Sequence, residues 1–200
     1  MNNVGLFIFD DVELLDFAGP YEVFSVTSEL NDYTLFRVFS VSEDGDPVRT
    51  VNGLKVVPDF AFDNHPPIDI LVIPGGVGTK KEMDKSAIVE WIRWNHDRAK
   101  MTVSVCSGAR ILARMGLLDG FEVTTHHEVF DDVRRIAPSV TLNTEARFVD
   151  NGRIITAGGI SAGIDVSLHI VRKLHGEEVA GRTARYMEYG DWQHLPEETL

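Results

Sequence analysis

Three short stretches that read as buried strands constrain the fold of this 200-residue chain more than any other feature. They lie at residues 4–9, 69–73 and 101–105, and the first two are almost continuously apolar. A strand that is apolar at nearly every position must be covered on both faces, which occurs mainly in parallel sheets with helices on each side. Strand and helix patterns alternate along the chain with short connections. We therefore predict an α/β fold, with a mostly parallel sheet sandwiched by helices on both faces, and one domain over residues 1–200.

Local signals predict the remaining elements. Gly19 and Pro20 are typical of a helix cap and a first helical position, and Asn-Gly at residues 52–53 and 151–152 is typical of hairpin turns. Further strands are predicted at residues 33–41, 121–125, 140–142, 147–150 and 153–156, and further helices at residues 86–98, 109–115, 128–137 and 177–189, with one more that follows the glycine-rich passage 157–165 and ends at Leu174.

The only cysteine, Cys106, lies where the predicted strand 101–105 is followed directly by the helical pattern 109–115. The small residues Ser104 and Gly108 flank it. This is the steric requirement of a nucleophile elbow, in which a reactive side chain is held on a sharp turn from strand to helix. The first amides of the helix and its dipole favour a thiolate over a thiol. We therefore expect Cys106 to be an ionised nucleophile; a small buried hydrophobic residue is the alternative.

An acidic residue and a glycine pair accompany this elbow. Asp16 lies between Leu15 and Phe17 in a segment predicted to be buried, and a buried carboxylate needs a partner or a raised pKa. Gly75 and Gly76 follow the second apolar run, where glycines let backbone amides approach a ligand at the carboxyl end of a strand. An ordinary strand-helix loop is the alternative, and the pattern of a phosphate-binding loop is absent.

The composition argues against several classes of function. Asp and Glu number 31 against 19 Lys and Arg, and the formal net charge of -12 disfavours binding to nucleic acid or to an anionic membrane. A single cysteine excludes an internal disulfide framework and suits a reducing compartment. No apolar window reaches the roughly 18 residues of a membrane-spanning helix, and the N-terminus lacks the features of a signal peptide. We therefore expect a soluble cytoplasmic protein that acts on a small-molecule substrate.

Several motifs occur together in this chain, namely LLDFAGPYEVF, DILVIPGG, SVCSGA, GLLDG, TTH and ITAGGISAGID. In this order, and over most of residues 4–175, they resemble the ThiJ/PfpI superfamily. The resemblance implies the flavodoxin-like fold of the class I glutamine amidotransferase-like proteins. Within the superfamily, the chain is most similar to isonitrile hydratases and to the amidotransferase-like domain of certain transcriptional regulators.

The resemblance also implies a set of site residues. Cys106 corresponds to the nucleophile and Asp16 to its acidic partner, which is an aspartate in the hydratase branch and a glutamate in many others. Backbone donors to the reacting group are expected at Gly75, Gly76 and Ser107, and a substrate pocket at His126, His127, Gly159 and Ile160. No metal and no organic cofactor is implied, and a homodimer is expected.

Two positions depart from the patterns of related branches. Ser107 stands where the peptidase branch has a histidine, so that proteolytic mechanism lacks its base. His127 stands where the hydratase branch usually has a tryptophan, which changes the pocket. Adjacent histidines on a strand point to opposite faces, and this disfavours a metal site shared by His126 and His127. His126 is then either a base for Cys106 or a hydrogen-bonding residue of the pocket.

The chemistry implied by the hydratase resemblance is the addition of water to an isonitrile. Cys106 would form a thioimidate with the terminal carbon, Asp16 would supply a proton, and an N-substituted formamide would be released. A glyoxalase or deglycase and a redox-stress protein would use the same cysteine. A regulator-type domain would bind a small molecule without turnover, but such regulators carry a helix-turn-helix module after the domain. No basic extension follows the last predicted helix here, which disfavours that function.

Overall fold

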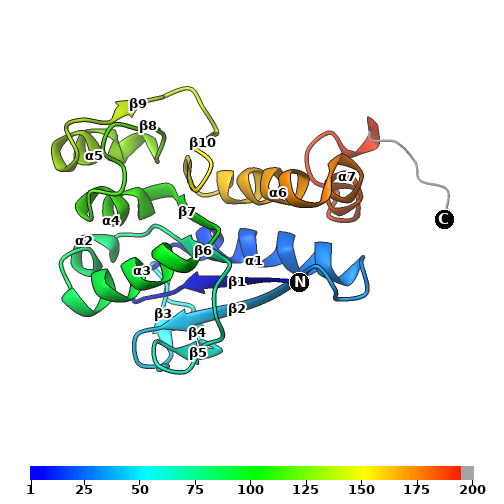
Figure 1. Ribbon diagram of the computed structural model, residues 1–200, viewed down its shortest axis with the longest axis horizontal. Coiled ribbons are helices and arrows are strands. Elements are labelled where there is room, and N and C mark those ends of the chain that lie inside the picture. The colour runs from blue at the N-terminus through cyan, green and yellow to red at the C-terminus, as the bar shows by residue number, and fades with distance from the viewer. Residues whose placement is uncertain (195–200) are drawn as a thin grey trace.

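A mostly parallel sheet forms the centre of the computed structural model, which describes residues 1–194 (Figure 1). Its strands within these residues run in the order β10 (Phe148–Asp150), β11 (Ile154–Ala157), β7 (Met101–Val105), β6 (Ile70–Ile73), β1 (Asn2–Phe7), β2 (Phe36–Ser42) and β5 (Phe60–Ala61). Neighbouring strands are parallel except for β10 and β11. The predicted α/β fold is confirmed.

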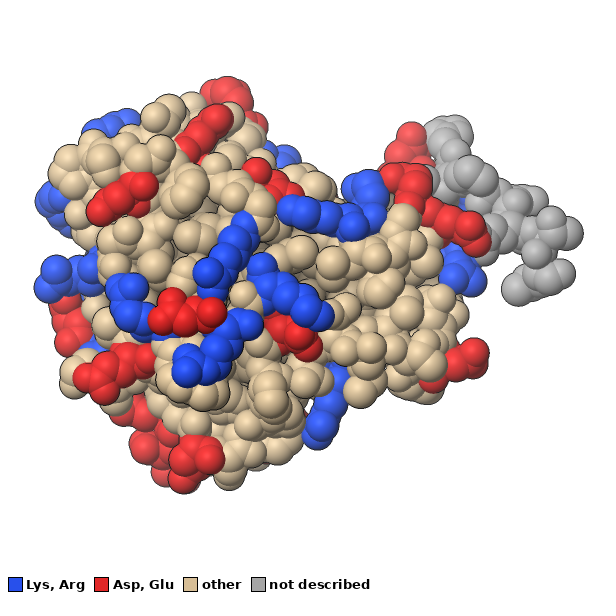
Figure 2. Space-filling model, viewed as in Figure 1, with Lys and Arg blue, Asp and Glu red and all other residues tan. Residues whose placement is uncertain are grey.

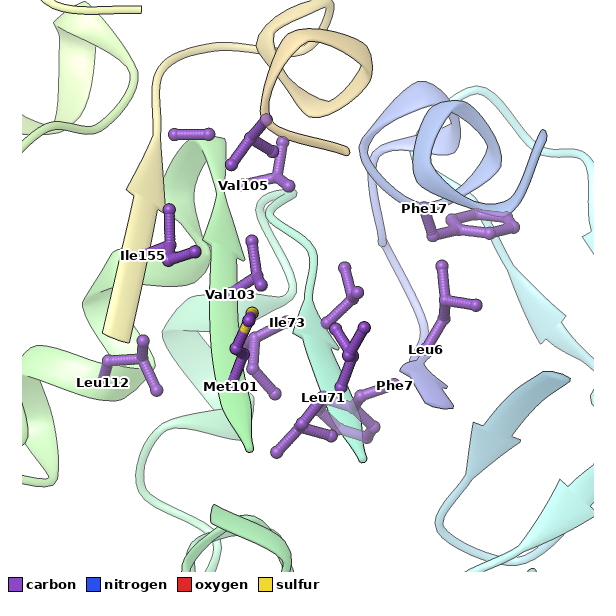
Figure 3. Close-up of a cluster of buried hydrophobic side chains, with 14 of the residues drawn as sticks. Leu6, Phe7, Phe17, Leu71, Ile73, Met101, Val103, Val105, Leu112 and Ile155 are labelled. Atoms are coloured by element: carbon purple, nitrogen blue, oxygen red, sulfur yellow. The ribbon is translucent and has the colours of Figure 1, made fainter. Parts of the chain in front are cut away.

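Helices cover both faces of this sheet. They are α1 (Leu14–Glu29), α2 (Thr79–Glu82), α3 (Ser86–Arg98), α4 (Ala109–Arg114), α5 (Phe130–Ile136), α6 (Ala162–His175) and α7 (Glu177–Tyr186). The first and sixth cover one face, and α3 and α4 cover the other (Figure 1, Figure 3). The last helix, α7, packs against α1 and α6, while α2 and α5 pack against α4.

Apolar side chains fill the space on both sides of the sheet (Figure 3). In β1, Leu6 points toward Phe17 of α1, whereas Phe7 points to the opposite face. There Phe7 lies against Trp91 of α3, with ring centroids 5.6 Å apart. Leu6 and Phe7 are both fully buried, and burying a side chain of this size contributes about 2 kcal/mol. The continuous apolar pattern of this strand thus reflects burial on both faces.

Several short strands lie outside the central sheet. The predicted hairpin is confirmed by the antiparallel pairing of β3 (Val48–Arg49) with β4 (Lys55–Val56). A separate pair of parallel strands is formed by β8 (Glu122–Val123) and β9 (Thr141–Leu142). The strand predicted around β8 is therefore short, and it ends before the two histidines that follow.

The first helix begins earlier than predicted, and Pro20 lies inside α1 rather than at its first position. The Gly-Pro sequence instead lets α1 and α6 approach closely. A Cβ atom on Gly19 would lie 3.0 Å from the Ile164 side chain. A Cβ atom on Gly163 would lie 3.2 Å from the Pro20 ring. Because α1 begins at Leu14, Asp16 lies in its first turn.

Charged side chains are spread over the surface. On the face drawn in Figure 2, acidic and basic side chains lie next to one another. The ion pairs Arg114–Asp84 and Arg134–Asp131 are exposed, so each contributes little to stability. No helix among the described residues is long and apolar enough to cross a membrane.

Candidate active site

Cys106 lies on the sharp turn that the sequence predicts. It follows β7 directly and opens the short 3-10 segment Cys106–Gly108, after which α4 begins. Its φ of 55° lies in the left-handed region, which residues other than glycine rarely adopt. Two contacts hold this conformation: Cys106 N donates to the Gly158 carbonyl at 2.9 Å, and Thr125 Oγ1 donates to the Cys106 carbonyl at 2.6 Å. The nucleophile-elbow geometry is confirmed.

Asp16 is fully buried beside this elbow. Its Oδ2 accepts a hydrogen bond from Gly75 N at 2.8 Å, while Oδ1 has no conventional hydrogen-bond partner among the described residues. Burial outweighs the Gly75 amide, which lowers the pKa of Asp16, and raises this pKa to about 7. Glu13 contributes to the increase, and the neighbouring Cys106 side chain opposes it. The prediction of a raised pKa for this carboxyl is confirmed.

The pKa of the Cys106 thiol is raised, contrary to the prediction from the helix dipole. Burial, followed by the nearby Asp16 carboxylate, raises the pKa of this thiol to about 12. The amides of Ile160 and Ser107 point at the sulfur and lower the pKa, but they do not offset the loss of hydration. The prediction failed because the side chain is buried and α4 has only six residues. A raised thiol pKa lowers the fraction of thiolate, which is the form that peroxide oxidises.

The two glycines of the strand-helix loop face Asp16 and Ser107. The Gly75 amide binds Asp16, as described above, and Gly76 N donates to Ser107 Oγ at 2.9 Å. Ser107 Oγ in turn donates to the Gly76 carbonyl at 3.1 Å. A Cβ atom on Gly75 would lie 2.5 Å from Ser107 N and 2.7 Å from Asp16 Oδ2. These glycine amides therefore support the carboxyl and the elbow, while the amides of Ser107 and Ile160 contact the sulfur.

An open cavity of ≈ 490 Å³ lies beside Cys106. The predicted residues Gly76, Cys106, Ser107, His126 and Ile160 line it, together with Glu13, Val77, Lys80, Arg110, Glu128, Val129 and Asp132. His127 and Gly159 do not line it. A small substrate placed in this cavity can therefore reach the sulfur.

The sequence predicts that His126 and His127 lie on a strand and point to opposite faces. This prediction is wrong. His126 precedes the 3-10 segment His127–Val129, and the two rings lie 4.3 Å apart at an angle of 33°. His126 Nδ1 accepts a hydrogen bond from Glu128 N at 3.2 Å, and burial and His127 lower the pKa of His126. Gly159 makes room for this ring, because a Cβ atom there would collide with His126 Cδ2. Residues 1–194 contain no group of three or more His, Cys, Asp or Glu side chains placed to hold a metal ion.

Arg110 is a cavity residue that the motifs do not reveal. It is 7% exposed, and it donates to Asp132 Oδ2 through Nε at 2.9 Å and Nη2 at 2.7 Å. Its Nη1 donates to Thr79 Oγ1 at 3.2 Å. This guanidinium lowers the pKa of Asp132. The only signal in the sequence is an arginine amid the apolar residues of α4, where a buried charge needs an acidic partner.

Comparison with known proteins identifies the family of this chain. The sequence pattern of the DJ-1/PfpI family matches residues 2–173. The chain belongs to the DJ-1/PfpI family. Isonitrile hydratase from Pseudomonas putida is 32% identical over 187 residues, which are 93% of this chain and 78% of the hydratase.

Other relatives of this DJ-1/PfpI protein differ in what they do. The HTH-type transcriptional regulator GbdR from Pseudomonas aeruginosa is 28% identical over 94% of this chain, which spans about half (50%) of the regulator's length. Among solved structures, a ThiJ/PfpI family protein from Pseudomonas syringae has a TM-score of 0.84 and 27% identity, covering 100% of this chain and 77% of that one. Family membership alone therefore does not define the substrate.

Proposed function

We propose that this DJ-1/PfpI protein hydrates isonitriles to N-substituted formamides with Cys106 as the nucleophile. The observation that supports this most is the buried carboxyl of Asp16 beside the Cys106 thiol, with a pKa of about 7 that keeps a proton available near neutral pH. The sequence identity of 32% with an isonitrile hydratase, over 93% of the chain, supports the same substrate class. An isonitrile carbon needs both a nucleophile and a proton, and this pair supplies them.

The first step adds the thiol to the terminal carbon of the isonitrile. Asp16 donates its proton to that carbon as the sulfur of Cys106 bonds to it, and the thiol proton passes to the Asp16 carboxylate. The new C–H and C–S bonds convert the isonitrile to a thioimidate, and Asp16 is protonated again. The thiol loses its proton only as the C–S bond forms, so its raised pKa is compatible with this step.

The second step adds water and releases the product. The water oxygen bonds to the thioimidate carbon, and one of its protons passes to nitrogen. The C–S bond then breaks, the remaining hydroxyl proton passes to the sulfur by way of Asp16, and the N-substituted formamide leaves. General acid-base help of this type is worth about 100- to 10,000-fold in rate. The amides of Ser107 and Ile160 stabilise the negative charge on sulfur as it develops and as it leaves.

The experiment is a panel of isonitriles, with formamide production as the readout. Wild-type protein should produce formamide, Cys106→Ala should produce none, and Asp16→Asn should lose about 100-fold or more in kcat. Asp131→Asn is the control, because Asp131 is exposed on α5 and does not line the cavity. Formamide production that survives Cys106→Ala would remove the nucleophile assignment.

Methylglyoxal is a second candidate substrate, because His126 lines the same cavity and has a pKa below its ordinary value of 6.5. Cys106 would add to the aldehyde to give a hemithioacetal. Neutral His126 would then take the proton from the first carbon and return it to the second, while the hydroxyl proton of the first carbon passes to the ketone oxygen, giving a thioester. Water hydrolyses this thioester to lactate and restores the Cys106 thiol. His126→Asn should abolish lactate production and leave isonitrile hydration intact. No lactate from the wild-type protein would exclude this function.

We also propose that the protein acts as a cytoplasmic homodimer. The family resemblance supports the dimer, and the single cysteine supports a reducing compartment. Light scattering on the purified full chain tests the first part, and cell fractionation tests the second. A monomer at micromolar concentration, or recovery outside the cytoplasm, would contradict the respective part.

A further inference from the structure

The backbone amides of Ile160 and Ser107 contact the Cys106 sulfur, and Ile160 has a strained backbone conformation. Its φ is 45°, in the left-handed region that β-branched residues avoid. Such a conformation is costly and persists only where surrounding contacts hold it. Within the chain segment itself, Ala162 N donates to the Gly159 carbonyl and Gly163 N to the Ile160 carbonyl, and further contacts come from a brace, defined here as the side chain and backbone of Arg147 with Asp165.

Arg147 makes contacts at both ends of this loop. Its guanidinium donates to Asp165 Oδ2 through Nε at 2.8 Å and also through Nη2. Nη2 donates to Oγ of Ser161, the residue after Ile160, at 3.1 Å. The Arg147 carbonyl accepts a hydrogen bond from Gly158 N at 2.9 Å. Side chain and backbone of one arginine thus fix the residues on either side of the strained position.

Two more contacts connect this arrangement to the cysteine and to Tyr189, which follows α7. The Gly158 carbonyl accepts the hydrogen bond from Cys106 N, so the Gly158 residue lies between Arg147 and the elbow. Tyr189 donates from its hydroxyl to Asp165 Oδ1 at 2.9 Å. Asp165 is therefore held by an arginine on one side and by a tyrosine on the other. Its position in the first turn of α6 fixes the whole brace to that helix.

We propose that Arg147 is a positioning residue for the nucleophile: together with Asp165 it holds the strained loop so that the Ile160 amide points at the Cys106 sulfur. Without the brace, Ile160 relaxes toward an ordinary negative φ and its amide turns away. The developing thiolate then loses one of its two amide donors. This inference rests on Cys106 being the reactive group and does not depend on which substrate it attacks.

The test is alkylation of Cys106 by iodoacetamide across a range of pH, followed by intact mass. Cys106 is the only cysteine, so the mass reports one site. Arg147→Met should lower the alkylation rate about tenfold at each pH below the thiol pKa, the effect of losing one hydrogen bond to a charged sulfur. Arg134→Met is the matched control, because Arg134 is similarly exposed and paired with an aspartate, and it should leave the rate unchanged.

A second pair of variants separates positioning from general stability. Glycine adopts a positive φ without strain, so adding Ile160→Gly to Arg147→Met should restore the rate to within about threefold of wild type. Asp165→Asn keeps the shape of the side chain and should lower the alkylation rate less than Arg147→Met does. If Arg147→Met does not fold, Asp165→Asn serves as the test variant in its place. A lower melting temperature with an unchanged alkylation rate, or no rescue by Ile160→Gly, would overturn the inference. Alkylation needs no turnover, so failure of isonitrile hydration would not affect this test.

Discussion

Replacing Asp16 with asparagine should stabilise the protein at neutral and alkaline pH while it removes activity. The carboxyl is fully buried, and one of its oxygens has no conventional hydrogen-bond partner among the described residues. Ionisation of such a group is unfavourable in the folded protein and favourable in the unfolded chain. Asparagine keeps the shape and the acceptor for Gly75 N, but it cannot ionise.

The magnitude follows from the pKa of Asp16, which burial raises from 3.8 to about 7. Below about pH 4 the Asp16 carboxyl is protonated in both the folded and the unfolded chain, so it does not lower the free energy of unfolding. As pH rises from 4 through 7, it ionises first in the unfolded chain, and the free energy of unfolding of the wild type falls. The full difference corresponds to about 4 kcal/mol, at 1.36 kcal/mol per tenfold change in proton affinity. The free energy of unfolding of Asp16→Asn minus that of wild type should therefore increase by up to about 4 kcal/mol between pH 4 and pH 8.

Urea unfolding at a series of pH values measures this difference directly. Asp132→Asn provides a contrast of opposite sign, because Arg110 lowers the pKa of Asp132. The stability contributed by Asp132 is present above its unfolded pKa and is lost as pH falls, so this variant should be most destabilised at neutral pH. A stability difference for Asp16→Asn that does not change with pH would show that the carboxyl is not held in a raised-pKa state, and the mechanism above would lose its acid.

Three further predictions concern the same site. The kcat/KM for isonitriles should fall about tenfold for each pH unit above pH 7, since Asp16 must carry its proton, and a flat profile from pH 6 to pH 9 would contradict its role as the acid. Gly75→Ala should lower the free energy of unfolding by about 1–3 kcal/mol, because the new Cβ would press on Ser107 N and Asp16 Oδ2; urea unfolding checks this against Gly181→Ala, where a Cβ atom meets nothing within 4 Å. Peroxide should oxidise Cys106 more slowly than it oxidises free cysteine at pH 7, because the thiol pKa is about 12; rapid sulfinate formation by intact mass would refute this.

The sequence predicts the framework of the site because that framework depends on local patterns. The predicted strand 101–105 coincides with β7. The small residues around Cys106 allow the sharp turn that follows this strand. Asp16 could be placed in the site from its unusual position between apolar neighbours and from the family resemblance. These features are encoded in side-chain size and polarity along a few consecutive residues.

The parts that were not predicted depend on contacts between distant segments. Pro20 lies inside α1, and its ring packs against Gly163 of α6, a contact that the sequence around Pro20 does not reveal. The ionisation state of Cys106 depends on how deeply the sulfur is buried and on the distance to a carboxyl 90 positions earlier in the chain. The left-handed conformation of Ile160 has no sequence signal, because isoleucine is among the residues least suited to it.

The most direct test of the central claim is the mass of the protein during turnover. Wild-type protein mixed with an isonitrile and quenched rapidly in acid should carry one additional substrate mass, located on the peptide that contains Cys106. The adduct should disappear as formamide accumulates, and it should be absent from Cys106→Ala. Formamide produced at the wild-type rate by Cys106→Ala, with no adduct on the protein, would contradict the account.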